Sequence, residues 1–432
     1  MIEILQIFVQ LLLFIFITYF PFNSLTFPKI LIHYKSDFFY FFFNIIFLSN
    51  ILLFTSFFSI NFYYLFGFIV FLYFLIFIFY FKEIFHKICE RNNLLIKLAF
   101  IFSNLFLFFE IASNLTIGWD GLSIWLNKAN NFYNGNNYFD LNSSYPHLGS
   151  YMWAFFWKNS FLQLEYLGRL FIVYVYLVTI FLFSSLLTGH KNFAKLLVIF
   201  FLIFFSYVKD LHGYQDILIF SILSAISILF ILPYLNKKLK KNYNYFFFLI
   251  LSINLLPWIK NECVFYTIFI ILLLLIGNNL SNLQKFLLLI VGLLNISFQI
   301  FIVKIYFQIQ LFQTPLNIEV LFANFLNLKE LIYRIFYITI YIFHSFFKYP
   351  IVLIGFSSFL IYLIYKQKIK LQNFYIIFFL LNMSFIYFTY ITTVSPIIWH
   401  LQTSIKRLMF QTSGFYLVLL MLLINKKKIK IS

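Results

Sequence analysis

The sequence predicts an all-α polytopic membrane protein, a helical bundle with about 12–13 transmembrane helices. Of its 432 residues, 63% are hydrophobic and only 10% are charged, and the mean hydropathy is +0.94. No soluble domain needs that much apolar surface. The apolar runs are continuous and ~15–25 residues long, as helices that cross ~30 Å of hydrocarbon must be. A transmembrane barrel would instead show short alternating segments with a polar inner face.

The candidate spans follow one another with mostly short polar loops between them. The first run lacks a basic leading segment and a small-residue cleavage site, so it predicts a first helix and not a cleaved signal. No soluble domain, repeat or long linker interrupts the chain, which predicts one integral membrane domain over 1–432, with N-terminal helices in 1–94 and a core in 95–425. The predicted spans are 1–20, 38–60, 62–81, 95–113, 166–187, 194–208, 215–234, 245–258, 263–277, 286–309, 350–366, 373–393 and 408–425.

The basic residues indicate how the bundle lies in the membrane. A net charge of +18 suggests a nucleic-acid partner at first, but most of the 31 Lys and Arg residues sit in alternate loops between apolar runs. Cytoplasmic loops carry such an excess, so these loops are predicted to face the cytoplasm and no nucleic-acid partner is expected. The loops lie near 29–35, 82–97, 191–195, 237–241, 285, 366–370 and 426–430.

Acidic residues are concentrated on the opposite, outer side. Only three of the 13 acids fall in the cytoplasmic loops. The positive-inside rule concerns Lys and Arg and says little about acids, so this asymmetry predicts chemistry on the outer face. The outer acids are Glu3, Glu110, Asp120, Asp140, Glu165, Asp210, Asp216, Glu262, Glu319 and Glu330.

The longest stretch without an apolar run is 114–150, and its centre is Trp119–Asp120. Polar loops of this length cost conformational entropy to order and are usually functional. Asp120 can accept a proton from an acceptor hydroxyl or hold a divalent cation, or it can cap the helical stretch that follows it. Lys128 lies about two turns further along the same face, where it either contacts a phosphate or is solvated at the interface.

Two clusters of polar residues follow in the chain. Tyr145 ends the polar loop, where the proline after it forces an extended backbone and a turn into the next amphipathic piece. Residues 209–216 place four titratable groups between two spans. A glycine in this segment would allow a tight turn that points Asp216 toward the Asp120 loop, and a plain solvated hairpin is the alternative. The candidate ligands here are His212, Tyr214 and Asp216.

Two more clusters sit at the ends of later spans. Lys260 and Glu262 have almost no loop around them, so they lie at the membrane edge, where ionisable groups mark a site or pair with each other. His400, Lys406 and Arg407 precede the last span. The two cations run against the inside bias, so they have an anionic partner such as phosphate or anchor a lipid headgroup. Because all these clusters share one side, they are predicted to converge in one pocket.

Residues 311–348 fit the alternation of loops only if they do not span the membrane. Charged residues are scattered among apolar ones in this segment, which predicts one or two helices lying along the outer interface. Pro350 then opens the next span, because proline is tolerated in the first turn of a helix. The charged residues of the segment are Glu319, Lys329, Glu330 and Arg334.

Five motifs occur in a fixed order between residues 95 and 425: GWDGLSIWLNKA, YPHLGSYMW, HGYQDILI, WIKNEC and WHLQTSIKRLMFQ. Together they resemble bacterial members of the GT-C superfamily, polytopic glycosyltransferases that use a polyprenyl-phosphate-linked sugar. Relatives in that superfamily include protein O-mannosyltransferases and lipid A aminoarabinose transferases. Two features depart from the family pattern. Family members usually place the acidic loop after their first helix, whereas here three apolar runs precede the span that leads into it. Many members also carry two adjacent acids in that loop, whereas here Gly121 follows Asp120.

The resemblance implies a GT-C-like bundle in the bacterial inner membrane, with interfacial helices on the outer face and Asp120 as the catalytic base. The donor would be a polyprenyl-phosphate sugar and the acceptor a glycan, a lipid or a protein of the cell envelope. Transfer would invert the anomeric carbon on the outer face. Metal ligands stay unknown, and a divalent cation is the one cofactor left open. Glu262 and Asp216 would hold sugar hydroxyls or orient the base. The substrate-binding candidates are Lys128, Tyr145, His212, Tyr214, Lys260, His400 and Arg407.

Two other functional classes compete with sugar transfer. A transporter or flippase for lipid-linked sugars or polysaccharides usually has ionisable residues near the bilayer midplane and broken helices in matched halves. In this sequence the charges lie at the ends of spans, and no two halves resemble each other. An O-antigen polymerase or ligase also acts on the outer face, but such enzymes generally carry a large outer loop late in the chain, whereas here the largest polar loop is early.

Overall fold

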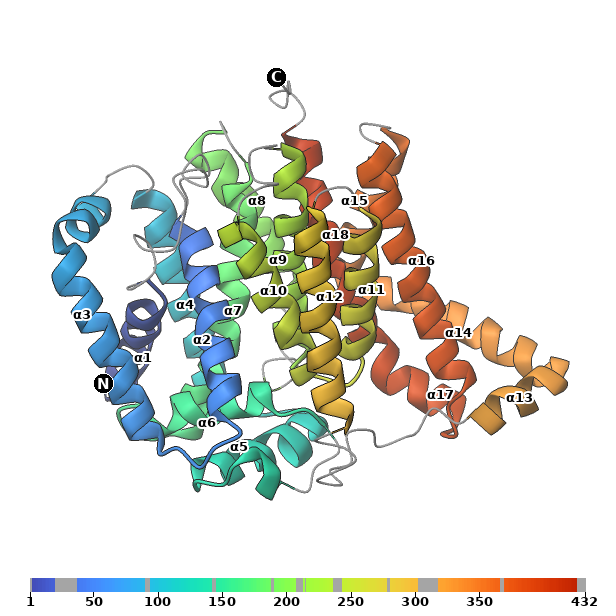
Figure 1. Cartoon of the computed structure of the whole chain (residues 1–432), viewed down its shortest axis with the longest axis horizontal. Coiled ribbons are helices and arrows are strands. Elements are labelled where there is room, and N and C mark those ends of the chain that lie inside the picture. The colour runs from blue at the N-terminus through green and yellow to red at the C-terminus, as the bar shows by residue number, and fades with distance from the viewer. Residues whose placement is uncertain are drawn as a thin grey trace.

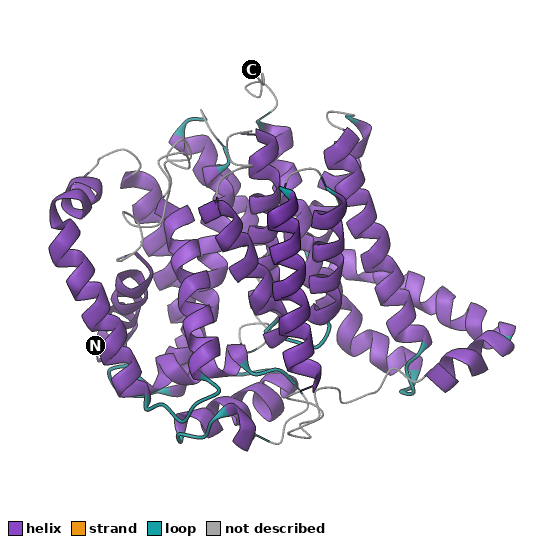
Figure 2. Ribbon diagram, in the orientation of Figure 1, coloured by secondary structure: helices purple, strands orange, loops and turns teal. Residues whose placement is uncertain are grey.

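A computed structural model of the chain describes residues 2–19, 37–89, 94–141, 145–187, 190–206, 213, 215–235, 243–277, 280–301, 318–365 and 369–425. Throughout these residues the secondary structure is helical, with turns and short loops and no strand (Figure 2). Among the described residues, six helices are long and apolar enough to cross a bilayer, and a seventh span results if two helices joined by a sharp bend are counted as one. Several other apolar helices are shorter. The predicted all-α polytopic membrane protein is confirmed.

Each of the thirteen predicted spans overlaps a helix, and most boundaries agree within a few residues. The helix predicted over 62–81 continues to Cys89, and the end of the span predicted over 286–309 lies outside the described residues. The second predicted span ends early, at Thr55, where the hydroxyls of Thr55 and Ser56 bond to carbonyls three residues back and compete with helix continuation. The helices are α1 (Ile2–Tyr19), α2 (Asp37–Thr55), α3 (Phe62–Cys89), α4 (Leu94–Ser113), α7 (Glu165–Ser185), α8 (Asn192–Ser206), α9 (Asp216–Leu235), α10 (Tyr243–Leu255), α11 (Cys263–Ile276), α12 (Asn282–Ser297), α15 (Pro350–Ile364), α16 (Ile369–Ile391) and α18 (Lys406–Ile424).

The polar stretch 114–150 is not an open loop, because most of its described residues are helical. It contains the π-helical turn η2 (Gly121–Leu126), α5 (Asn127–Tyr133), the short 3₁₀ helix η3 (Tyr138–Asp140) and the start of α6 (Leu148–Lys158). α5 and α6 pack on each other and lie across one end of the bundle (Figure 1). This layer is ordered by the bundle beneath it and can hold side chains in fixed positions.

The helices of the bundle run side by side and alternate in direction (Figure 1). α7 is buried along its whole apolar length and α18 packs on α9 and α15, so these helices form the centre. The first residues of α7, α9, α11 and α18 meet at the end that α5 and α6 cover, and the C-terminus lies at the opposite end. Four of the lysines predicted to be cytoplasmic have described side chains. They lie in or next to the first turns of α4, α8 and α12, which begin at the end where the C-terminus lies: Lys97, Lys191, Lys195 and Lys285.

Two helices extend sideways from the covered end, α13 (Ile318–Leu326) and α14 (Leu328–Lys348) (Figure 1). α14 meets α15 at a bend of 107°, and Pro350 is the first residue of α15, as predicted. Arg334 pairs with Glu330 at 2.7 Å and donates to the carbonyl of Thr393 at 3.1 Å, which fixes α14 to the end of α16. A helix at this angle to a span has the orientation expected along an interface.

Candidate functional site

Asp120 and Arg407 meet at the covered end of the bundle. The guanidinium of Arg407 donates a hydrogen bond of 2.5 Å to the Asp120 carboxylate, across 287 positions of sequence. Both side chains keep some contact with the exterior, with 27% of Asp120 and 17% of Arg407 exposed. Asp120 makes no side-chain bond to the helical turn after it, so it is not the helix cap that was the alternative. The sequence predicted an anionic partner for Arg407, and in the structure Asp120 is such a partner.

Both members of this ion pair adjoin a π-helical turn. Asp120 immediately precedes η2, and a second π turn, η8 (Leu401–Ile405), immediately precedes α18 and Arg407. η8 continues α17 (Ile397–His400), so α17, η8 and α18 form one long helix. Single π turns are rare and often occur at functional sites, where the extra residue changes the direction of side chains. No sequence pattern marked these two turns.

Gly121 has a packing role beside Asp120. A Cβ atom added to Gly121 would lie 3.3 Å from the carbonyl oxygen of Gly213 and 2.3 Å from the side chain of Ile117. Gly213 therefore lies close against η2, and a side chain at position 121 would force Ile117 or the backbone to shift.

A second charged group lies nearby and is more deeply buried. The ammonium of Lys260 is 3.1 Å from Asp216 and 2.8 Å from Glu262. Asp216 is the first residue of α9, where the positive end of the helix dipole favours a carboxylate, and its side chain is fully buried. Burial favours the neutral amine of Lys260, but the two carboxylates outweigh it and raise the pKa of Lys260. The Lys–Glu pairing considered as an alternative for this cluster is present.

Gln411 completes the buried group and was not predicted from the sequence. Its side-chain amide donates to Asp216 and, at 3.1 Å, to Glu262, and its carbonyl oxygen accepts a hydrogen bond of 3.2 Å from Tyr266. Gln411 follows Arg407 by four residues and so lies on the same face of α18. That spacing was the signal that could have identified it.

Tyr145 lies close to both charged groups. Burial raises the pKa of its hydroxyl, and the charges of Lys260, Glu262, Asp120 and Arg407 all act on it. Tyr145 is therefore linked electrostatically to four of the predicted site residues.

Lys128 is placed differently from either expectation. Its side chain is buried, which rules out a solvated interfacial lysine. Its ammonium donates to the backbone carbonyl of Tyr145 and, at 3.3 Å, to that of Pro146, and it lies 5.4 Å from the centre of the Trp125 ring. Burial lowers the pKa of Lys128 to about 7. Lys128 thus contacts the protein backbone at the position where the sequence suggested a phosphate.

The remaining predicted ligands lie at the edge of the group or outside the described residues. The imidazole Nδ1 of His400 is 2.8 Å from the Thr393 hydroxyl, and its ring packs against Tyr390 at 4.9 Å. Arg407 is close enough for its charge to act on His400. His212 and Tyr214 lie outside the described residues.

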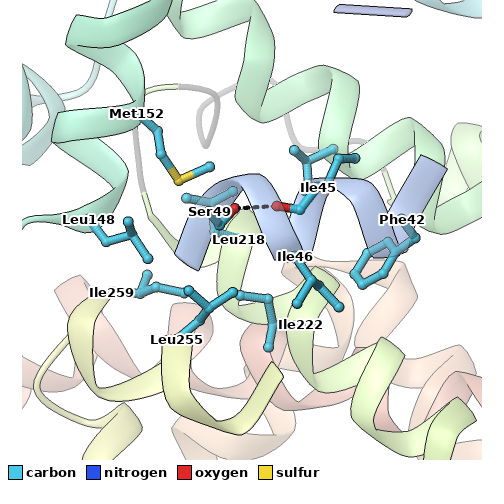
Figure 3. A pocket seen from close by; sticks show the side chains of 11 residues that line it. Phe42, Ile45, Ile46, Ser49, Leu148, Met152, Leu218, Ile222, Leu255 and Ile259 are labelled. Atoms are coloured by element: carbon cyan, nitrogen blue, oxygen red, sulfur yellow. Dashed lines mark hydrogen bonds between the residues drawn. The ribbon is translucent and has the colours of Figure 1, made fainter. Parts of the chain in front are cut away.

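The apolar pocket inside the bundle offers no chemistry of this kind (Figure 3). Its only polar side chain is Ser49, whose hydroxyl donates to the Ile45 carbonyl of its own helix at 2.7 Å. Ligand sites combine an apolar wall with a few oriented polar groups, so the charged residues are the stronger candidate site. The pocket is lined by Phe42, Ile45, Ile46, Ser49, Leu148, Met152, Val175, Leu218, Ile222, Leu255 and Ile259.

The site combines the partly exposed carboxylate of Asp120 and the guanidinium of Arg407 with a buried cluster of polar side chains. That cluster consists of Asp216, Lys260, Glu262 and Gln411. Among the described residues, no three His, Cys, Asp or Glu side chains gather closely enough to hold a metal ion. Asp216 and Glu262 instead share the ammonium of Lys260. Such a site can accept a proton at Asp120, bind an anion at Arg407 and accept hydrogen bonds from hydroxyl groups.

Comparisons with models of protein families, with curated proteins and with solved structures each return no match. The likeness to the GT-C superfamily is therefore a hypothesis that rests on the five motifs and on the residues just described.

Proposed function

We propose that the protein is an inverting glycosyltransferase that uses a polyprenyl-phosphate-linked sugar and acts on the outer face of a bacterial plasma membrane. The contact between Asp120 and Arg407 is the observation that supports this function most directly. It brings a base and an anion-binding group together at the end of an apolar bundle, where a lipid-linked phosphate would reach the interface. The acceptor would be a glycan, a lipid or a protein of the cell envelope.

In this mechanism Asp120 takes the proton of an acceptor hydroxyl. The acceptor oxygen forms a bond to the anomeric carbon, from the side opposite the phosphate, so the configuration inverts. The bond between that carbon and the phosphate oxygen breaks, and its electron pair leaves on the polyprenyl phosphate. A base within hydrogen-bond reach contributes roughly 10²–10⁴-fold to such a step. Stabilising the charge on the leaving phosphate contributes a further large term.

Arg407 is a better candidate than Lys260 for the donor phosphate. Lys260 already lies between two carboxylates, whereas the side chain of Arg407 is more exposed. A guanidinium can bind two phosphate oxygens at once and stays charged at any working pH. A phosphate that engages Arg407 would loosen its contact with Asp120. The carboxylate would then be available to the acceptor hydroxyl, so donor binding would prepare the base.

The buried acids are candidates for holding the sugar. Oδ2 of Asp216 has no hydrogen-bond partner among the described residues, and the Glu262 side chain is 15% exposed. Carboxylates accept hydrogen bonds from hydroxyls, and a buried carboxylate oxygen without a donor is costly. Lys260 and Gln411 hold both acids in fixed positions, which suits the recognition of a particular arrangement of hydroxyls.

The test compares cells with and without the gene by mass spectrometry of their membrane glycolipids and envelope glycans. We expect a glycan or glycolipid to lose a sugar when the gene is absent, and Asp120→Asn to reproduce that loss at normal membrane levels. Asp140→Asn is the matched control, because Asp140 lies on the same polar stretch and its carboxylate accepts a hydrogen bond from the backbone of Asn137, the cap of η3. Full activity of Asp120→Asn would remove Asp120 from the mechanism, and unchanged glycans without the gene would refute the function.

A further inference from the structure

Lys128 has no role in the proposed mechanism, yet it occupies an unusual position. It comes from α5, and its ammonium reaches the turn that joins the polar stretch to α6. The hydrogen bonds to the carbonyls of Tyr145 and Pro146 are charge-assisted when the amine is protonated. The rings of Trp125 and Tyr145 lie 5.4 and 5.8 Å from the ammonium, within the range of cation–π attraction. Four contacts thus converge on one buried cation.

We infer that Lys128 is a positioning residue that fastens the turn at Tyr145 and Pro146 and so holds the Tyr145 ring beside the charged residues. The hydroxyl of Tyr145 lies within reach of the charges of Asp120, Lys260, Glu262 and Arg407. Small displacements of a substrate-positioning side chain cost activity, so a fixed turn has a functional value.

A purely stabilising role does not account for a lysine here. An ammonium taken out of water loses its hydration, and carbonyl oxygens replace only part of it. The lowered pKa of Lys128, about 7, reflects this burial. An apolar side chain of similar length would fill the same space without that cost. Unlike an apolar side chain, the amine of Lys128 can donate hydrogen bonds to the carbonyls of Tyr145 and Pro146.

The strength of this support should vary with pH near neutrality. The buried groups packed on Lys128 are His147 and Tyr145; burial and the charge of Lys128 lower the pKa of His147, and burial raises that of Tyr145. Neither changes charge between pH 6 and 8. Lys128 does, since its pKa is about 7. Because burial lowers this pKa, opening the turn and returning Lys128 to water is favoured when the amine is protonated. The turn is therefore held most firmly above pH 7, where the neutral amine still donates to the two carbonyls.

Hydrogen exchange of the purified full chain in lipid nanodiscs tests this role without a transfer assay. In Lys128→Met, peptides that cover 145–151 should exchange roughly threefold to tenfold faster at pH 8, the loss expected for a hydrogen bond from an uncharged donor. The wild type, corrected for intrinsic rates, should be better protected at pH 8 than at pH 6, because opening the turn returns Lys128 to water. Lys128→Met should show no such difference, and Lys128→Arg should restore part of the protection.

Lys158→Met is the matched control. Lys158 ends α6 and lies 4.0 Å from the centre of the Tyr133 ring, but it makes no part of the turn at Tyr145. Its exchange pattern over 145–151 should equal that of the wild type. Equal exchange in Lys128→Met and the wild type would overturn the role of Lys128. The importance of the turn for sugar transfer rests on the proposed function. Faster exchange together with undiminished transfer would leave Lys128 as a support of the turn and refute its effect on activity.

Discussion

The side chain of Arg407 reaches Asp120 from the opposite end of the sequence, and their contact of 2.5 Å joins the polar layer to the last helix of the bundle. Each residue is next to a π turn, so neither side chain has the direction that a regular helix would give it. Neither residue can be assigned a role without the other. An isolated acid or cation in such a chain is a common interfacial residue, whereas this pair has the composition of a site for hydroxyl and phosphate groups.

Arg407→Gln is expected to lower transfer by roughly 10²–10³-fold, the effect of removing one group that stabilises developing charge. Arg407→Lys should recover only part of the rate, because an ammonium cannot bind two phosphate oxygens in a planar fork. Rates are measured on proteoliposomes with matched protein content. The double variant Asp120→Asn with Arg407→Gln should be little worse than the more severe single variant, since the two act in one step. Strictly additive losses would contradict a shared role.

Lys260→Met should destabilise the protein strongly, by about 3–5 kcal/mol, because Asp216 and Glu262 would keep buried charge without their cation. Thermal unfolding in detergent gives the measurement. Adding Asp216→Asn to this variant should recover part of the loss, since it removes one of the two uncompensated charges. A Lys260→Met protein as stable as the wild type would show that the ammonium does not hold this group together.

Gln411→Leu is expected to loosen the two buried acids. It removes donors to Asp216 and Glu262, and a hydrogen bond to a charged group contributes about 1.5–3 kcal/mol. Gln372→Leu is the control, because Gln372 is also buried but donates to the carbonyls of Tyr362 and Leu363. We expect Gln411→Leu to lower both the melting temperature and the apparent affinity for substrate. If only stability falls, and by the same amount as in the control, Gln411 has no part in the site.

Gly121→Ala tests the close contact beside Asp120. A Cβ at this position would collide with the side chain of Ile117 and press on the backbone of Gly213, so η2 must move. Gly67→Ala is the comparison, because a Cβ on Gly67 meets nothing within 4 Å. Transfer should fall well below that of Gly67→Ala at equal membrane levels. Equal transfer by the two variants would mean that the position of η2 is not critical for Asp120.

The helices were predictable because each apolar run must satisfy its own backbone in lipid, and this makes run length a direct guide to helix position. The bend before Pro350 was predictable for a related reason, since scattered charges excluded 311–348 from the hydrocarbon. The polar stretch was harder to interpret. Its helices are stabilised by packing on the bundle, and propensity alone gives little indication of such helices.

The types of the site residues were predictable from the sequence, but the pairs that they form were less so. Asp120, Lys260, Glu262 and Arg407 stood out because charge is rare in this chain. Gln411 did not, because an uncharged amide within an apolar helix gives a weak signal. The role of Lys128 depended on which atoms surround it, and a lysine in an amphipathic stretch is usually solvated. Pairings between distant segments follow from helix packing, which no local pattern encodes.

The pH dependence of stability offers a last test, centred on Lys128. Its pKa falls from 10.5 to about 7 on folding, so between these values the unfolded chain binds more protons than the folded one. The free energy of unfolding must therefore rise with pH across this window. Comparing the wild type with Lys128→Met cancels the other titrating groups, and chemical unfolding in detergent at pH 7, 8 and 9 supplies the values. We expect the wild type to gain stability relative to Lys128→Met as the pH rises. A difference that stays constant over this range would mean that Lys128 keeps an ordinary pKa and is not a desolvated cation.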